Sequence, residues 1–450
     1  MPSGTRKTDL LCPPDQPLAG RSGRLLAVAA FAILLLAVIS AAGLRAQEAP
    51  PASLVLEADR VFDGVDLHDG WRVVVAGDRI VAAGPPASVP LPPGDAVRRL
   101  RLAGATLLPG LIEGHGHLFL HPYDETSWTD QVLREPLAER VARATVHARD
   151  TLMAGFTTAR DLGTEGAGYA DVGLQQAIAK GVIPGPRLLV AGRAIVATGS
   201  YGPKGFAPEL DVPRGAEEAD GAALERVVRD QIGKGADLVK VYADYRWGPA
   251  GEARPTFTLA ELERIVEVAA ASGRPVVAHA ATAEGMRRAA LAGVQTIEHG
   301  DGGTPEVFAL MRDRGVAWCP TLAAADAIVR YGGWDGTPPE PERLQAKRRT
   351  MQAALESGVT ILAGGDAGVF PHGDNARELE LMVDYGMTPL ATLRAATSAS
   401  AETLALPTLG RIVPGATADL LAVQGDPIGD IAVLRDVLLV IQDGVLVREP

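Results

Sequence analysis

The stretch "LLPGLIEGHGHLFL", residues 107–120, places two histidines one residue apart at the end of an apolar run. The whole chain of 450 residues has only 8 His, so this spacing is conspicuous. In a β-strand, residues i and i+2 point to the same face, so His115 and His117 project together and Gly116 leaves the space between them open. Two imidazoles on one face can bind one metal ion, although an isolated pair is more often without one.

The middle of the chain alternates short β-type runs with helical stretches. The eight runs are 105–117, 156–163, 187–195, 238–244, 275–280, 295–300, 317–322 and 360–366. The helical stretches 258–273 and 304–315 begin with Thr or Thr-Pro and end with Gly, as helices commonly do. Eight strand–helix units predict the α/β class and a (β/α)8 TIM barrel, which we assign to residues 109–406.

The two ends of the chain after its leader share a different, β-rich texture. Residues 57–108 and 407–450 hold short apolar runs interrupted by Gly, Asp and Pro, and a "DG" pair at 443–444 predicts a hairpin turn. We therefore expect one small, discontinuous β-sandwich domain formed from both termini of the mature chain.

The first 46 residues read as an export signal. A basic, polar segment precedes the uncharged apolar stretch 25–44, and small residues follow it. This pattern predicts a cleaved signal peptide at 1–46, a Pro/Ala tether at 47–56 and a periplasmic enzyme. The apolar stretch is also about long enough to span a bilayer, so an uncleaved anchor facing the periplasm is the alternative.

Composition excludes several classes of partner. The formal charge of −12 argues against nucleic acid, which requires basic patches. No phosphate-binding G-x-x-x-x-G-K-[ST] loop occurs. We expect a small-molecule amide substrate and no membrane contact beyond the leader, with a homo-oligomer left open. Of the two cysteines, Cys12 precedes the expected cleavage point and Cys319 reads as a packing residue.

Further polar residues lie at the ends of separate strands in the predicted barrel. They are Lys240, His279, His299 and Asp366. Each has an ordinary interpretation: a lysine that reaches solvent, a hydrogen-bonded core histidine, or a turn aspartate. Barrel active sites form at the carboxyl ends of the strands, so these residues should meet the histidine pair at one mouth. Their coincidence favours a metal site over the separate interpretations.

These residues carry a resemblance to a known family. The segments "PGLIEGHGHL", "VKVYA", "AHA", "IEHG", "GGDAG" and "GRIVPGATADLLAV" resemble the metal-dependent amidohydrolase superfamily, on the branch with Xaa-Pro dipeptidases and imidazolonepropionase-like proteins, over about residues 52–450. The resemblance implies two divalent ions, with zinc as the best guess and manganese or cobalt as alternatives. His115, His117 and Asp366 would bind one ion, His279 and His299 the other, and a Lys240 carboxylated by CO2 would bridge them.

Elementary chemistry agrees with this implied site. Burial lowers a lysine pKa and leaves the neutral amine that carbamate formation needs. Two neighbouring cations can share a hydroxide and lower the pKa of its parent water towards about 7. Asp366 would be the catalytic residue that takes a proton from it and passes the proton to the departing amine. The expected reaction is hydrolysis of amide bonds in dipeptides or N-acyl amino acids.

The chain departs from the dipeptidase pattern around the substrate. Ala281 stands where such enzymes have a tyrosine in "HAY", and Tyr201 replaces a histidine in the loop after the third strand. We assign substrate contacts to residues near the expected mouth, namely Tyr201, Tyr242, Arg246 and His372. An arginine can hold a carboxylate with two parallel hydrogen bonds, and tyrosines supply a flat wall. For each, an ordinary loop residue is the alternative.

Two further functions stay open at this point. The first is a cyclic amide or lactone hydrolase of the same fold; a deaminase-type enzyme is disfavoured because its single-metal site lacks a bridging lysine. The second is a non-catalytic exported scaffold, which would have no need for a buried lysine among four histidines.

Overall fold

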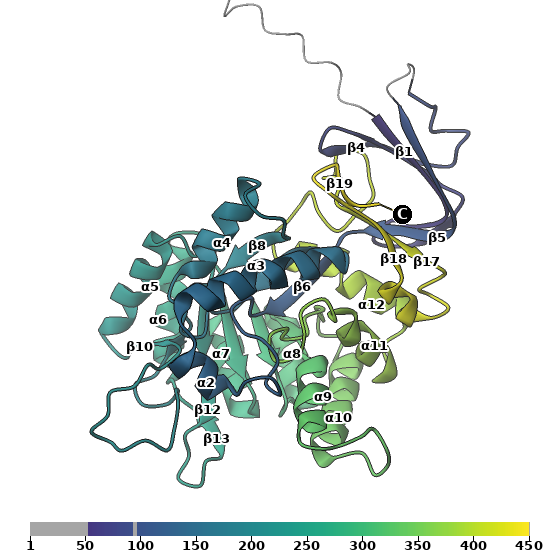
Figure 1. Ribbon diagram of the computed structural model, residues 1–450. Coiled ribbons are helices and arrows are strands. Elements are labelled where there is room, and N and C mark those ends of the chain that lie inside the picture. Colours follow the sequence, from purple (N-terminus) through teal and green to yellow (C-terminus); the bar gives the residue numbers. More distant parts are fainter. Residues whose placement is uncertain (1–52, 93–96, 450) are drawn as a thin grey trace, which may run out of the picture. The chain divides into compact units, whose positions relative to one another are not determined.

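The computed structural model describes residues 53–92 and 97–449 (Figure 1). The expected signal peptide and residues 47–52 of the expected tether lie outside the described residues. For residues 53–56 the tether prediction is wrong, because they begin the first strand and three of them are buried. Within the described part, no helix combines the length and the apolar character needed to cross a bilayer.

Strands from both ends of this described chain form one eight-stranded sheet. Its members are β1 (Ser53–Phe62), β2 (Leu67–Asp69), β3 (Arg72–Ala76), β4 (Arg79–Gly84), β5 (Arg98–Pro109), β17 (Leu420–Gln424), β18 (Val437–Gln442) and β19 (Val445–Arg448). The order is β19-β18-β17-β5-β1-β3-β4, and β2 pairs with β1. β5 joins the two ends, because it is parallel to β1 and antiparallel to β17. In Figure 1 the purple first strands accordingly lie beside the yellow last strands.

The sequence explains this sheet locally. Many of its apolar side chains, among them Val61, Leu107 and Leu420, are fully buried in one cluster. The "DG" pair between β18 and β19 has positive φ at both positions, 48° at Asp443 and 76° at Gly444, as a type I′ turn requires. The predicted hairpin turn is thereby confirmed.

The middle of the chain supplies short parallel strands. They are β6 (Leu111–Gly116), β7 (Phe156–Asp161), β8 (Arg187–Val190), β9 (Ile195–Val196), β10 (Glu217–Glu218), β11 (Val239–Tyr242), β14 (Val276–Ala280), β15 (Thr296–His299) and β16 (Ala317–Cys319). β6, β7 and β8 pair in that order, and β10, β9, β11, β14, β15 and β16 pair in a second group. The Asp237 amide donates to the Val190 carbonyl at 2.8 Å, which links β8 to the segment before β11.

The run predicted as the eighth strand, residues 360–366, forms isolated parallel bridges instead of a regular strand. Trp318 pairs with Ile361 and Gly116 with Ala367, so the segment connects β16 with β6. Gly364 explains the irregularity: a Cβ there would lie 2.5 Å from the Cys319 sulfur and 2.7 Å from the His115 amide nitrogen. The backbone approaches its neighbours too closely for any other residue.

Helices follow these strands along the chain. They are α2 (Trp128–Arg134), α3 (Leu137–Met153), α4 (Ala170–Ala179), α5 (Ala223–Gly233), α6 (Leu259–Ala270), α7 (Ala283–Ala292), α8 (Pro305–Arg314), α9 (Leu322–Tyr331), α10 (Glu342–Ser357), α11 (Ala376–Asp384), α12 (Pro389–Ala395), α13 (Ser398–Thr403) and the 3-10 helix η1 (Ile431–Arg435). Thr258 and Thr304 cap α6 and α8 through their side chains, and Gly315 ends α8 with φ 68°. A short hairpin, β12 (Asp244–Arg246) and β13 (Ala253–Pro255), follows β11. The described fold is therefore mixed α/β, as predicted.

Candidate active site

Three of the predicted metal ligands converge. His115 and His117 lie at the end of β6, and Asp366 follows the Gly364–Gly365 segment beside them. The Asp366 Oδ1 atom is 3.6 Å from His115 Nε2 and 3.3 Å from His117 Nε2. All three side chains are buried and their donor atoms are close enough to share one ion.

The other three predicted ligands adjoin this group. The ring of His299, at the end of β15, lies 5.0 Å from that of His115 and 4.5 Å from that of His279, measured between centroids. Lys240 on β11 pairs in register with Val277 on β14, two residues before His279. Its side chain is almost completely buried. The structure thus brings together all six residues that the sequence assigned to the metals.

The free atoms of this cluster fit a metal ion. His115 Nε2 and Asp366 Oδ1 are buried and make no hydrogen bond with any described residue. The opposite ring nitrogens are fixed, since His115 Nδ1 lies 2.9 Å from Glu298, His117 Nδ1 donates to the Gly163 carbonyl at 2.7 Å and His299 Nδ1 lies 2.8 Å from Thr321. In metal sites, the ring nitrogen of a ligating histidine that does not bind the metal is typically held in this way by a carboxylate, a backbone carbonyl or another polar group.

The pKa shifts of two of these histidines are also consistent with metal binding. Burial lowers the pKa of His279 to about 3 and that of His299 well below its usual range, so both rings are neutral, as ligation requires. Burial opposes protonation of His117 as well, but the Asp366 carboxylate, whose Oδ1 atom lies 3.3 Å from His117 Nε2, raises its pKa to about 9.

No carboxylate among the described residues forms an ion pair with Lys240. Burial lowers its pKa, although Glu298 and Asp366 act in the opposite direction. Among the described residues, its ammonium nitrogen makes no hydrogen bond or ion pair. A buried lysine without a partner is held in its neutral form more easily than an exposed one.

A buried ion pair beneath the histidines was missed by the sequence reasoning. Glu298 on β15 accepts from Arg160 Nη2 at 2.9 Å and holds His115 Nδ1 at the same distance. Thr296 donates to Glu298 as well. Burial disfavours this charge, but Arg160 and His115 hold the pKa of Glu298 well below its usual range. The signal was two charged residues inside apolar strands, in "TTARDLG" and "TIEHG".

A second buried carboxylate connects β6 with the Asp366 segment. Glu113 accepts from the amides of His115 and Gly365 at 3.1 and 2.9 Å, and from Asn375 Nδ2 at 2.7 Å. Burial raises the pKa of Glu113 to about 7. This network connects β6 with the segment that carries Asp366, and both hold predicted metal ligands.

The backbone around the site is unusual. His299, Thr321, Asp366 and Glu165 have φ of 70°, 51°, 65° and 47°, a region that residues other than Gly rarely adopt. Such conformations persist only where the surroundings enforce them, and they gather at functional sites.

A cavity of about 640 Å³ opens over the cluster. It is lined by three of the residues predicted to contact substrate, Tyr201, Tyr242 and Arg246, and by Ala281. Further lining residues that the sequence reasoning did not single out are Trp128, Glu165, Tyr245 and Arg343. Three tyrosine rings form one wall, with Tyr201 4.8 Å from both Tyr242 and Tyr245, and Tyr242 stacks on His279 at 4.5 Å.

The fourth predicted substrate residue, His372, is placed elsewhere. It does not line the cavity; its ring stacks on His147 at 4.3 Å, and its Nε2 atom lies 3.1 Å from the Leu120 carbonyl oxygen. The positive φ values of Asp366 and of Gly368 (114°) turn the chain between the metal ligands and His372.

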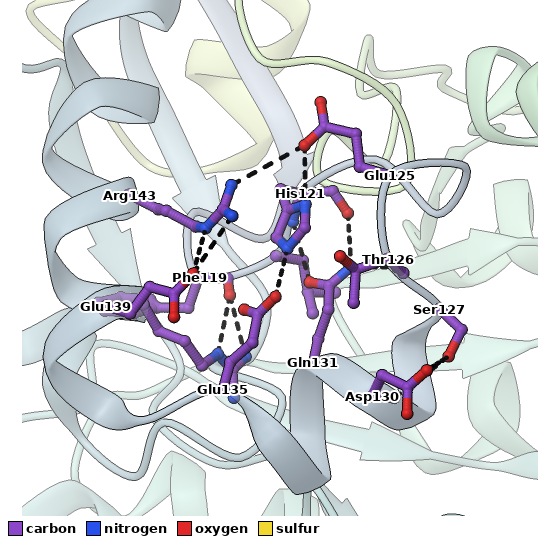
Figure 2. Close-up of polar contacts among 12 residues, drawn as sticks. Phe119, His121, Glu125, Thr126, Ser127, Asp130, Gln131, Glu135, Glu139 and Arg143 are labelled. Carbon is purple, nitrogen blue, oxygen red and sulfur yellow. Dashed lines mark hydrogen bonds and ion pairs between the residues drawn. The ribbon is translucent and has the colours of Figure 1, made fainter.

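His121 is also separate from the metal ligands, although it follows them closely in sequence. Figure 2 shows its ring between two carboxylates, with Glu125 Oε2 at 3.1 Å and Glu135 Oε1 at 2.8 Å. Gln131 bonds both the amide and the carbonyl of His121. These contacts tie the loop after β6 to α2.

Comparisons with known proteins identify the family of the chain. A model of the Amidohydrolase family matches residues 106–447. The ochratoxinase of Aspergillus niger is 30% identical over 411 residues, which cover 83% of this chain and 81% of that protein. Its crystal structure has a TM-score of 0.75, with 27% identity over 89% of this chain and 97% of that one. A crystal structure of a Xaa-Pro dipeptidase with bound methionine in its active site has a TM-score of 0.76, with 32% identity over 88% of this chain and 100% of that one. The resemblance seen in the sequence is confirmed. The chain belongs to the amidohydrolase family and is a hydrolase that acts on carbon–nitrogen bonds.

Proposed function

We propose that this hydrolase cleaves amide bonds in dipeptides or N-acyl amino acids at a site for two divalent metal ions, with zinc as the resident metal. The observation that carries the proposal is the convergence of three buried donor atoms: Asp366 Oδ1 lies 3.6 Å from His115 Nε2 and 3.3 Å from His117 Nε2. Two further neutral histidines and a buried lysine adjoin them. Nitrogen and oxygen donors of this kind suit zinc in hydrolytic sites.

The ligands divide into two sets. His115, His117 and Asp366 would hold one ion, His279 and His299 the other, and a carboxylated Lys240 would bridge them. Carboxylation needs a neutral amine that attacks CO2 and releases a proton, and the lowered pKa of the Lys240 ammonium favours that form. When bound, the ions supply Lewis-acid polarisation of the scissile carbonyl and a water that is acidic near neutral pH.

Asp366 is the proposed proton carrier. Burial disfavours its charge, but His115 and His117 lower its pKa to about 2, so the carboxylate is ionised at neutral pH and can accept a proton. Its position between the two histidines allows it to take a proton from the attacking water. It would then pass that proton to the leaving nitrogen, which must be protonated before the amine departs.

The cavity supports a substrate with an apolar body and a carboxylate. Its tyrosine wall offers flat apolar surface, and the guanidinium groups of Arg246 and Arg343 make no ion pair with any described residue. Either group can hold a carboxylate with two parallel hydrogen bonds. Ala281 leaves open the space that a tyrosine fills in the dipeptidase pattern.

The architecture and location are part of the same proposal. We infer that the parallel strands form a (β/α)8 barrel over residues 109–406, because their pairing runs from strand to strand and returns to β6 through the Gly116–Ala367 bridge. Residues 57–108 and 407–450, together with residues 53–56 at the start of β1, would form the accompanying β-sandwich domain. The basic and apolar leader supports export to the periplasm, which cell fractionation with an antibody against the chain would test.

Substrate screening tests the proposal directly. The purified, zinc-loaded enzyme is offered dipeptides, N-acyl amino acids, hydantoins and lactones, and product is followed by mass spectrometry. We expect turnover of the first two classes and its loss in His115→Asn. Turnover confined to hydantoins or lactones would instead support the cyclic amide or lactone alternative.

A further inference from the structure

One charged side chain on the cavity wall has no role in the chemistry described above. Glu165 follows β7 in the segment "DLGTEGAG" and lines the cavity, yet its side chain is buried. Its Oε2 atom accepts from Tyr201 Oη at 2.5 Å and from Trp128 Nε1 at 3.0 Å, and its Oε1 atom accepts from Tyr242 Oη at 3.3 Å. The Glu165 side chain accepts three hydrogen bonds and donates none, as an ionised carboxylate does.

Among the described residues no cation contacts this carboxylate directly; the buried guanidinium of Arg140, which donates to the Glu165 backbone carbonyl, interacts with its charge only at longer range. Within the described residues, no Lys or Arg side chain forms an ion pair with Glu165, and all three of its donors are neutral. A buried charge is costly unless a counterion joins it. The Oε1 atom accepts a single long hydrogen bond, from Tyr242, and a carboxylate oxygen can accept a second one.

The surroundings of Glu165 suit a cation. Trp128, Tyr201, Tyr242 and Tyr245 form a connected aromatic cluster around it, with ring centroids 4.8 to 5.8 Å apart in the neighbouring pairs. Aromatic faces beside a carboxylate attract ammonium groups. Arg140 holds the backbone of this loop, because it donates hydrogen bonds to the carbonyls of Thr164 and Glu165. Glu165 itself has a positive φ.

We propose that Glu165, with its cage of Trp128, Tyr201 and Tyr242, binds the protonated α-amino group of a dipeptide substrate. The α-amino nitrogen is only two bonds from the scissile carbonyl carbon, so its site must lie next to the metal ligands. The loop meets this demand, because His117 donates to Gly163, two residues before Glu165, and Tyr242 stacks on His279. The inference rests on the proposed function and narrows it: the enzyme prefers free dipeptides to N-acyl amino acids.

Binding of ligands that cannot be cleaved tests this subsite in the zinc-loaded enzyme. Two ketomethylene isosteres of Ala-Phe, one with and one without the α-amino group, are compared by titration calorimetry. We expect the amino form to bind about 10- to 100-fold more tightly, the range of a charge-assisted hydrogen bond with cation–π support. If the wild-type enzyme binds the two isosteres with equal affinity, the inference is wrong, and no variant is needed to show it.

Variants and a third ligand locate the effect. Glu165→Gln should reduce the amino preference to near unity, while Glu209→Gln, which removes an exposed charge from the loop carrying Tyr201, should keep it. A des-amino isostere with a butylammonium side chain should gain nothing; a gain equal to that of the α-amino group would refute the assignment. If the amino preference appears but no amide is hydrolysed, the subsite stands and the proposed function fails.

Discussion

The ion pair between Arg160 and Glu298 gives the sharpest test of how this site is built. Both side chains are almost fully buried, and Glu298 links the guanidinium to the ring of a predicted metal ligand, His115. The substitution Glu298→Gln keeps the volume but leaves Arg160 as an uncompensated buried charge. Breaking a buried pair in this way costs about 3–5 kcal/mol. Arg160 retains its bonds to the Gly114 carbonyl and to Thr296, so we expect the lower end, about 3 kcal/mol.

The assay is urea unfolding of the metal-free protein at pH 7, for Glu298→Gln, Arg160→Met and the double variant. We expect the double variant to be more stable than the sum of the single effects predicts, by at least about 1 kcal/mol, since it no longer buries a lone charge. The exposed Glu356→Gln on α10 is the matched control and should change the free energy of unfolding by less than about 0.5 kcal/mol. Additive single effects would refute this account of the pair.

The same variant has a second readout at the metal. Partners of ligating histidines typically change metal affinity 10- to 100-fold when removed, so chelator competition should show a loss of about that size in Glu298→Gln. The pH dependence is fixed in sign. The folded-state pKa of Glu298 is depressed, so its contribution is present above the unfolded pKa of about 4.3 and fades as pH falls below it. The stability gap between wild type and variant should therefore narrow below about pH 4; a constant gap would contradict the assigned charge.

Three further outcomes can be measured. His115→Asn and Lys240→Met should each lose most of the bound metal, counted by elemental analysis of purified protein; full metal content would argue against these ligands. Burial raises the pKa of Glu378 to about 8, so its folded form keeps a proton that the unfolded chain releases above about pH 4.3, and this contribution falls as pH rises to 8. Glu378→Gln should therefore gain on the order of 2 kcal/mol over wild type between pH 5 and 8 in urea unfolding, whereas a pH-independent difference would refute the shift. Gly364→Ala should destabilise the fold by several kcal/mol because its Cβ meets the His115 amide, while Gly173→Ala, exposed within α4 with nothing nearby, should stabilise it by about 0.5–1 kcal/mol; similar effects at the two positions would contradict the close approach.

The strand-end residues of the site could be predicted because their signal is local. His279 and His299 lie at or near the ends of short apolar runs and Lys240 lies within one, and parallel strands deliver such residues to one edge. The periodicity of two within "HGH" fixed the shared direction of the two imidazoles on β6. These predictions required only the sequence pattern within single strands.

Residues that act through tertiary contacts could not be found in this way. Arg160 and Glu298 lie 138 positions apart, and only the pairing of strands makes them partners. Glu165 sits in a glycine-rich loop whose local sequence suggests only a turn. The prediction that His372 contacts substrate was wrong because it relied on closeness to Asp366 in sequence. The left-handed backbone at Asp366 turns the chain before His372, which does not line the cavity.

The mixed sheet has a consequence for how the polypeptide is made. β17 covers the edge of β5, yet the segment from Pro109 to Leu420 must be synthesised between them. At about 5–20 residues per second, the ribosome needs roughly 15–60 seconds for that interval. Throughout it the nascent β5 exposes unpaired amides and carbonyls that can template misassembly. A chaperone that shields this edge until the last strands emerge would raise the yield of native protein more than one acting on the finished chain.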